Sequence, residues 1–117
     1  MSLSISAAEY NAIQAGTMSE QKLQDAITGA AQRLGWLVYH THDSRRSQAG
    51  YPDLHLVHEK RQLSILRELK TQKGSCSPAQ LDWIRALTAA GVDIAVWRPI
   101  HWFDGTITAV LFPPEAR

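Results

Sequence analysis

The sequence has very little cysteine: Cys76 is the single one in 117 residues, so no disulfide can form within the chain. This usage is typical of proteins from reducing compartments. The sequence also has no run of the roughly 18 apolar residues that a membrane-spanning helix needs, and it has no internal repeat or low-complexity linker. We therefore expect a soluble, cytoplasmic protein with no membrane partner.

The sequence also has little net charge: 12 basic and 11 acidic side chains leave only +1 at pH 7. Residues 45–73, however, carry seven basic and three acidic side chains, whereas 1–44 carry two and four, and 74–117 carry three and four. A strongly basic nucleic-acid-binding domain would carry more cations on one face. The central excess is a modest footprint for a polyanion, and a solvated basic loop is the simpler alternative.

With 44% hydrophobic residues, the chain is long enough for one compact domain, which we expect to span residues 1–117. Ser6-Ala7-Ala8-Glu9 is a capping-box pattern and opens an N-terminal helix within residues 1–16. A second helix follows at once and stops at Gly35, and a third begins at Ser77-Pro78 and stops at Gly91. The side chains expected on the inner face of the third helix are Leu81, Ile84, Leu87 and Ala90.

Short apolar and β-branched stretches predict four strands, at residues 36–40, 53–58, 63–70 and 92–97. Residues 100–117 are predicted to add a terminal strand pair that turns at Asp104-Gly105, a favoured hairpin turn. The apolar side chains of this ribbon would either fill the core or form an interface: Trp102, Phe103, Ile107 and Leu111. The order of helices and strands predicts an α/β fold with a mixed central sheet flanked by helices.

The two middle strands bring acidic side chains together. If Lys60-Arg61 is the midpoint of their turn, Asp53 lies opposite Glu68, and like charges so placed destabilise a sheet. A hard divalent cation such as Mg²⁺ or Mn²⁺ would offset this repulsion, and Lys70 shares the same face. A one-residue slip would separate the pair. The alternative is a solvated Asp53 and an exposed Glu68–Lys70 ion pair.

The motifs Gly50-Tyr51-Pro52-Asp53 and Glu68-Leu69-Lys70 follow each other here in the order typical of one enzyme superfamily. They are accompanied by the helical Glu20, the basic pair Arg45-Arg46, and Gln80 at the start of the third helix. Together they resemble the PD-(D/E)XK nuclease superfamily, and more closely its VRR-NUC branch, over residues 20 to about 98. The resemblance implies a restriction-endonuclease-like αβββαβ core.

The resemblance also implies roles. Asp53, Glu68 and the carbonyl of Leu69, with Glu20 directly or through water, would hold Mg²⁺, for which Mn²⁺ would substitute; no organic cofactor is implied. Lys70 and Gln80 would complete the catalytic set. The residues implied to contact DNA phosphates are Arg45, Arg46 and Lys73.

Some of these residues also have purely structural explanations. Thr17 with Glu20, and Ser77 with Gln80, both fit the capping-box pattern, so each acidic or amide side chain could serve a helix end. His40-x-His42 and His55-x-x-His58 would suit zinc, but no third ligand stands at suitable spacing.

Stand-alone members of this branch resemble phage and bacterial enzymes that act as homodimers on branched DNA. The resemblance therefore implies a metal-dependent endonuclease that resolves Holliday junctions in DNA recombination and repair, in the cytoplasm of a bacterium or a phage-infected host. The alternatives are a flap-directed or single-strand-directed nuclease, or a catalytically silent DNA-binding module of the same fold.

Overall fold

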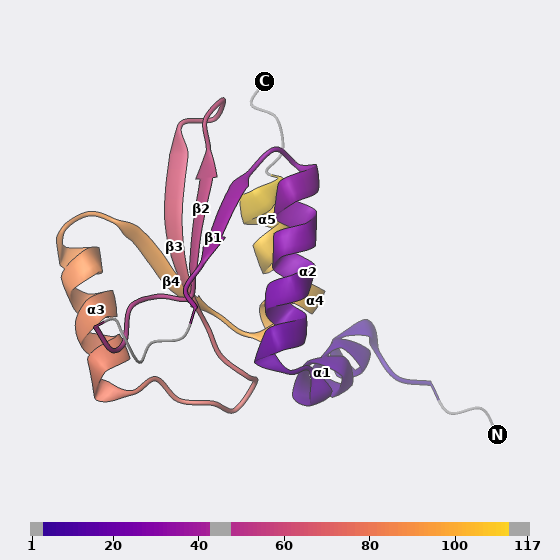
Figure 1. Cartoon of the computed structure of the whole chain (residues 1–117). Helices are drawn as coiled ribbons and strands as arrows, with labels where there is room; N and C mark the ends of the chain where they lie inside the picture. Colours follow the sequence, from indigo (N-terminus) through magenta and orange to yellow (C-terminus); the bar gives the residue numbers. More distant parts are fainter. Residues whose placement is uncertain (1–3, 43–47, 113–117) are drawn as a thin grey trace.

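The computed structural model describes residues 4–42 and 48–112, and it has a four-stranded sheet with helices on both faces (Figure 1). Within the described part of the chain, no helix is long and apolar enough to cross a membrane. The elements are α1 (Ala7–Thr17), α2 (Glu20–Arg33), β1 (Leu37–His40), β2 (Leu54–His58), β3 (Leu63–Leu69), α3 (Pro78–Ala89), β4 (Asp93–Trp97), α4 (Pro99–Phe103) and α5 (Thr106–Leu111).

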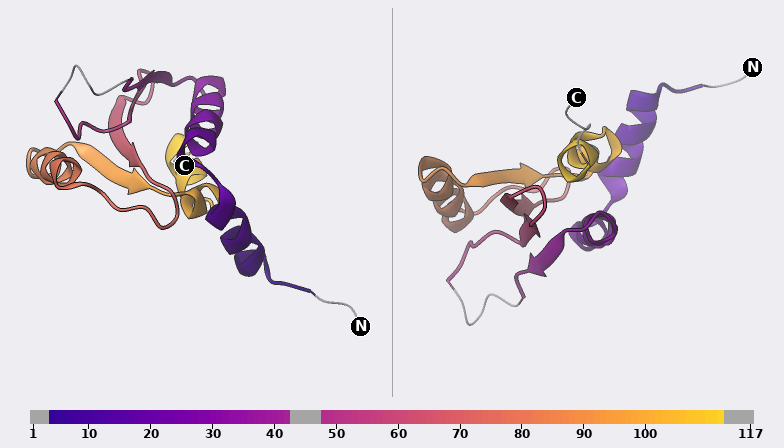
Figure 2. Two further views of the ribbon diagram at one scale, coloured as in Figure 1. Left: turned by 60° about the horizontal axis from the view of Figure 1, so that its bottom comes forward. Right: turned by 90° about the horizontal axis from the view of Figure 1, so that it is seen from above.

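The strands lie in the order β1-β2-β3-β4, with β1, β2 and β3 antiparallel in turn and β4 parallel to β3. The parallel pair needs a crossover, and α3 supplies it. The predicted mixed α/β architecture is therefore confirmed. Helices α2, α4 and α5 lie on one side of the sheet and α3 lies on the other, while α1 extends away from the body and packs on α4 (Figure 2).

The register between β2 and β3 is the one that the sequence predicted. Leu54 pairs with Arg67 and His58 with Leu63. One residue beyond the ladder, Asp53 therefore stands opposite Glu68. The turn closes with a hydrogen bond from the amide of Gln62 to the carbonyl of Glu59, at 3.0 Å.

The core lies between the sheet and the helices α2, α4 and α5. Its α2 members, Leu23, Ile27 and Ala31, are fully buried and follow the helical spacing of the sequence. The indole of Trp36 donates to the carbonyl of Leu111 at 3.0 Å and so ties the start of β1 to the end of α5. The other core residues are Leu54, Leu56, Ile65, Leu69, Trp97 and Ile107.

The prediction of which α3 side chains face the core is largely wrong. Leu81 is 51% exposed, Ala90 is exposed, and no residue of α3 is fully buried, although Ile84 and Leu87 are half-buried. The reason is that α3 packs mainly on β4, the edge strand of the sheet. A single strand covers only a narrow strip of a helix surface.

The terminal strand pair at residues 100–117 is also wrong, because 99–103 and 106–111 are the helices α4 and α5. Pro99 occupies the first turn of α4, where its missing amide costs nothing. Gly105, with φ +89°, links the two helices, so Asp104-Gly105 is a helix-to-helix turn. Ile107 and Leu111 are buried at helical spacing, which places them in the core rather than in an interface.

Candidate active site

The carboxyl end of β3 is buried on both faces, which is unusual for a stretch that holds charged residues. All five residues from Ile65 to Leu69 are buried, and Glu68 is only 1% exposed. Arg67 points to the core side, where it bonds Asp93 and lies over the ring of Trp97. Glu68 points to the α3 side. A buried carboxylate is costly unless other groups compensate its charge.

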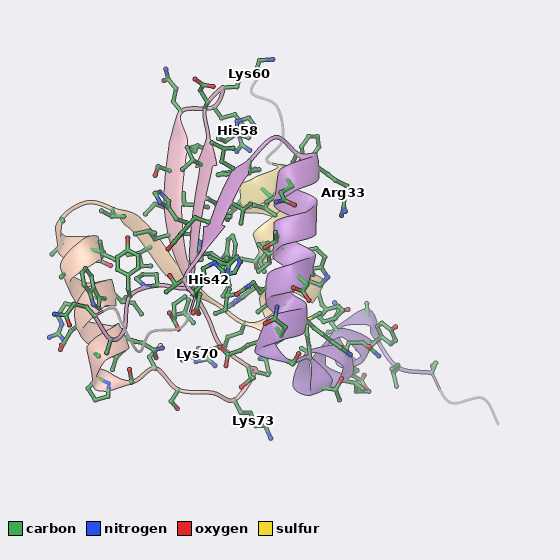
Figure 3. All side chains as sticks on the ribbon, viewed as in Figure 1. Arg33, His42, His58, Lys60, Lys70 and Lys73 are labelled. Carbon is green, nitrogen blue, oxygen red and sulfur yellow. The ribbon has the colours of Figure 1, made fainter. Side chains whose placement is uncertain are left out.

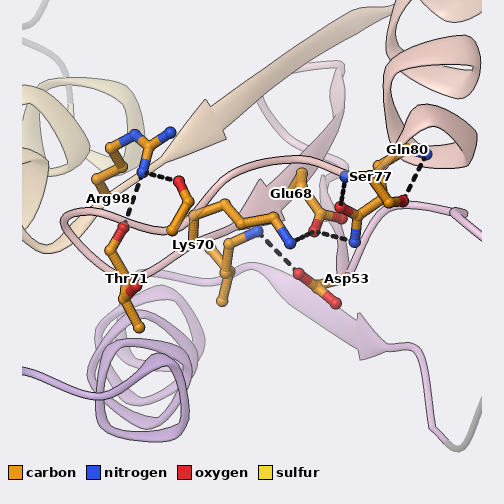
Figure 4. A network of polar contacts seen from close by, with 9 residues as sticks. Asp53, Glu68, Lys70, Thr71, Ser77, Gln80 and Arg98 are labelled. Carbon is orange, nitrogen blue, oxygen red and sulfur yellow. Dashed lines mark hydrogen bonds and ion pairs between the residues drawn. The ribbon is translucent and has the colours of Figure 1, made fainter.

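Glu68 is held by two side chains but is not satisfied by them (Figure 4). Its Oε2 accepts a hydrogen bond from Nε2 of Gln80 at 3.0 Å and lies 3.4 Å from Nζ of Lys70. Its Oε1 is buried and has no hydrogen-bond partner among the residues that the structure describes. One oxygen of the carboxyl group therefore faces the site without a donor.

Asp53 stands beside Glu68 and is fixed by the backbone of β3. Its Oδ2 accepts a hydrogen bond from the amide of Leu69 at 2.8 Å, so the carboxylate is anchored to the neighbouring strand. The structure thus brings together four of the predicted side chains, Asp53, Glu68, Lys70 and Gln80. The alternative of an exposed Glu68–Lys70 pair is wrong, because both side chains are largely buried.

The electrostatics of the pair favour a proton or a cation. Burial, and next the charge of Asp53, raise the pKa of Glu68 to about 8, and the nearby Lys70 only partly opposes the rise. The Lys70–Glu68 contact therefore does not act as a full ion pair at neutral pH. Without a bound cation, burial and the charge of Asp53 thus favour the protonated form of Glu68.

Gln80 serves a helix cap and the site at the same time. Its Oε1 accepts from the amide of Ser77 at 2.8 Å, while Oγ of Ser77 accepts from the amide of Gln80 at 3.2 Å. This is the predicted capping box at the start of α3. The cap fixes the orientation of the amide group, so that its Nε2 is directed at Glu68. The two alternatives for Gln80 are therefore compatible.

Gly50 brings the loop before Asp53 against the start of α3. Its φ is +90°, and a Cβ placed there would lie 2.5 Å from the carbonyl carbon of Ala79 and 2.7 Å from the amide nitrogen of Gln80. Only glycine allows this approach. Packing against α3 therefore requires a glycine at position 50, whether or not the site is catalytic.

We expect Gly50→Ala to destabilise the protein more than Gly91→Ala does. Gly91 has a similar φ, +84°, but open space around it, so its substitution costs only the roughly 1–2 kcal/mol of left-handed backbone. Gly50→Ala should add about 1–3 kcal/mol of overpacking. Chemical denaturation of both variants measures the difference. Equal free energies of unfolding would contradict the close contact.

Glu20 does not join the acidic pair. It is exposed at the first position of α2, whose cap is Ser19: Oγ of Ser19 accepts from the amide of Lys22 at 3.1 Å. The alternative explanation of Glu20, a capping box with Thr17, is therefore wrong. Within residues 4–42 and 48–112, no three His, Cys, Asp or Glu side chains are grouped to hold a metal.

The histidines have other contacts, and they do not form a zinc site in the described ranges. Nε2 of His55 lies 2.7 Å from Oγ of Ser64, and Nε2 of His58 lies 3.0 Å from the carbonyl of Leu34. Both histidines belong to β2, and because they are three residues apart, their side chains lie on opposite faces of the sheet.

The loop after Lys70 is organised by a residue that the sequence pattern did not reveal as functional. The guanidinium of Arg98 donates to the carbonyls of Thr71 at 2.8 Å and Gly74 at 2.6 Å (Figure 4). Its only sequence signal is its place directly after the strand β4. Lys73 lies farther along this loop, exposed and directed away from Lys70 (Figure 3). Arg45 and Arg46 lie outside the described residues.

The donor set suits a hard divalent cation. Two carboxyl groups face each other, and one of them has a buried oxygen with no partner among the residues that the structure describes. The ions that prefer such oxygens are Mg²⁺ and Mn²⁺. Burial and, after it, the charge of Asp53 raise the pKa of Glu68, and a bound cation would offset the repulsion from Asp53. The residues present therefore fit the predicted ion, although they supply only part of its coordination shell.

Comparisons with known proteins bear on the family and the fold of this chain. The family model described as "VRR-NUC domain" matches residues 6–99. A solved structure described as "VRR_NUC domain" is 24% identical, with a TM-score of 0.63, and the match covers 76% of this chain and 94% of that chain. At this level of identity, the likeness shows the fold. No curated protein matches the sequence.

Proposed function

Because the chain belongs to the VRR-NUC domain family and is thus a nuclease-type domain with DNA as its partner, we propose that it is a metal-dependent endonuclease. It would hydrolyse DNA phosphodiester bonds with Mg²⁺, and Mn²⁺ would substitute. The observation that carries the proposal is the buried Glu68, whose Oε1 has no partner in the described residues and whose pKa Asp53 helps to raise. A carboxyl group in this state is suited to binding a cation.

Asp53, Glu68 and the carbonyl of Leu69 would hold the ion. When bound, Mg²⁺ supplies Lewis-acid activation of the phosphate and lowers the pKa of water toward neutrality. Asp53 is already oriented by the amide of Leu69, and Glu68 by Gln80, so little reorganisation is needed. Glu20 would act only through water, from the start of α2.

Lys70 would stabilise negative charge that develops on the phosphate. Its Nζ is largely buried and lies 3.4 Å from Glu68, which positions it at the edge of the acidic pair. A buried cation acts more strongly than an exposed one, because solvent screens it less. Lys73, Arg45 and Arg46 would contact neighbouring phosphates without reading the base sequence.

The proposed substrate is branched DNA, and the proposed active form is a homodimer that resolves Holliday junctions. A two-fold dimer places two identical sites in a symmetric arrangement, which matches two symmetric strands of a four-way junction. Such an interface would not use Ile107 or Leu111, because both are buried in the core.

The test is cleavage of end-labelled four-way junction, flap, linear duplex and single-stranded DNA with Mg²⁺ or Mn²⁺. We expect paired, symmetric cuts in the junction by the wild type, and none by Asp53→Asn. Asp82→Asn, an exposed acidic residue on α3, is the matched control and should cleave normally. Cuts confined to flaps or single strands would replace the proposed substrate. DNA binding without any cleavage would instead indicate a silent binding module.

A further inference from the structure

Aromatic side chains line a pocket beside the candidate active site, on the α3 side of the sheet. Its volume is about 310 Å³, at the lower end of the range for pockets that bind small ligands. Among the described residues, none of its lining side chains carries a formal charge. They are Tyr39, Thr41, Gln48, Tyr51 and Trp83.

The pocket wall is held by contacts of its own. Nε1 of Trp83 donates to the carbonyl of Ala49 at 3.2 Å, so the indole has its hydrogen bond without using the pocket. Tyr51 meets Trp83 edge to face, with ring centroids 5.0 Å apart. The close approach of Gly50 to the start of α3 fixes the loop that carries Tyr51 against the helix that carries Trp83. The rings are thus positioned before any ligand arrives.

The same rings remain accessible to a ligand. Tyr39 is 59% exposed and Tyr51 is 38% exposed, although each carries a large apolar ring. Tyr39 stands on β1, and Tyr51 enters from the loop before β2. Exposed aromatic side chains that share one pocket mark a binding site more often than isolated ones do.

The pocket is joined to the candidate active site through three backbone connections. Tyr51 is two residues from Asp53, so their Cα atoms are at most about 7 Å apart. The amide of Thr41 donates to the carbonyl of Asp53 at 2.8 Å. Trp83 lies one helical turn after Gln80 on α3. A ligand in the pocket therefore lies next to the proposed cleavage site.

We propose that this pocket binds one unpaired nucleobase of the DNA substrate, adjacent to the phosphate that is cut. The inference rests on the proposed nuclease function. Aromatic side chains stack on any base because every base has a π face. The amide of Gln48 gives the base edge a polar partner, and the lining residues that the structure describes hold no charged side chain, which fits a neutral ring. A fully paired duplex offers no such base, whereas a branch point, flap or single strand does.

The experiment measures binding without cleavage, in EDTA, with the Glu68→Gln protein. The probes are a single-stranded oligonucleotide with one 2-aminopurine, the same base at a flap junction, and a fully paired duplex. Tyr39→Leu and Tyr51→Leu remove one stacking face each, and Tyr39→Phe and Tyr51→Phe retain it. Tyr10→Leu, 53% exposed on α1, is the matched control for loss of an exposed tyrosine.

We expect the parent protein to quench the 2-aminopurine of the strand and the flap. Each leucine variant should abolish the quench and weaken binding of these probes by about 5- to 150-fold, with duplex affinity unchanged. The phenylalanine variants and Tyr10→Leu should bind like the parent. If the leucine variants lose equal affinity for all three probes, or lose none, the base-binding proposal is overturned. The nuclease proposal then still stands if the wild type cuts DNA with Mg²⁺. No binding of any probe would overturn both proposals.

Discussion

Glu68→Gln is expected to abolish metal-dependent DNA cleavage and, at the same time, to stabilise the metal-free protein. The substitution removes a proposed ligand, and the charge stabilisation that a bound ion gives is worth several kcal/mol, so the rate should fall by about a thousandfold or more. The same substitution removes a buried acid that shares its site with Asp53. The free energy of unfolding at about pH 8 should therefore rise by roughly 1–3 kcal/mol.

This opposition between activity and stability separates a functional role from a structural one. If Glu68 were simply a core residue bound to Gln80 and Lys70, its loss would lower stability, and activity would follow only through unfolding. Initial cleavage rates and chemical denaturation of the same preparations measure both quantities. Glu59→Gln, an exposed acid at the turn of the same hairpin, should change neither. A destabilised Glu68→Gln protein with residual activity would contradict the assignment.

The sequence predicted the part of the site that depends on the alternation of side chains along a strand and on the pairing register of β2 and β3. Because side chains of a strand alternate strictly, the midpoint of the turn was enough to place Asp53 opposite Glu68, and the pairing of Leu54 with Arg67 confirms it. Gln80 was placed by a cap pattern that the structure reproduces. The roles of these residues in catalysis remain predictions, because geometry alone does not test them.

The rest depended on tertiary contacts that no local pattern encodes. Asp104-Gly105 fits a hairpin turn or a helix-to-helix turn equally well, and only the burial of Ile107 and Leu111 at helical spacing favours helices. Arg98 was missed because its partners are backbone carbonyls of another loop. The aromatic pocket was missed because its rings come from three separate segments.

The fold of the metal-free protein is expected to lose stability as the pH rises from about 5 to about 8. The pKa of Glu68 is raised to about 8 from an ordinary value of 4.5, so the folded state holds a proton that the unfolded chain releases in this window. Stability therefore falls wherever the folded state binds more protons, here by on the order of 1 kcal/mol per pH unit, and levels off above the folded pKa. Thermal melts across this range should show the decline, and Glu68→Gln should flatten it.

Mg²⁺ should reverse this decline, and its effect should grow with pH. A cation binds the ionised carboxylate, so below the folded pKa of Glu68 it must displace a proton, and its apparent affinity weakens as the pH falls. At a hundredfold excess over its dissociation constant, the ion adds about 2.7 kcal/mol. The melting temperature should thus rise strongly with Mg²⁺ at about pH 8 and little at about pH 5, in the wild type and not in Glu68→Gln. A Mg²⁺ effect of equal size at both pH values would mean that the ion binds elsewhere, because only a site that includes Glu68 exchanges its proton for the metal.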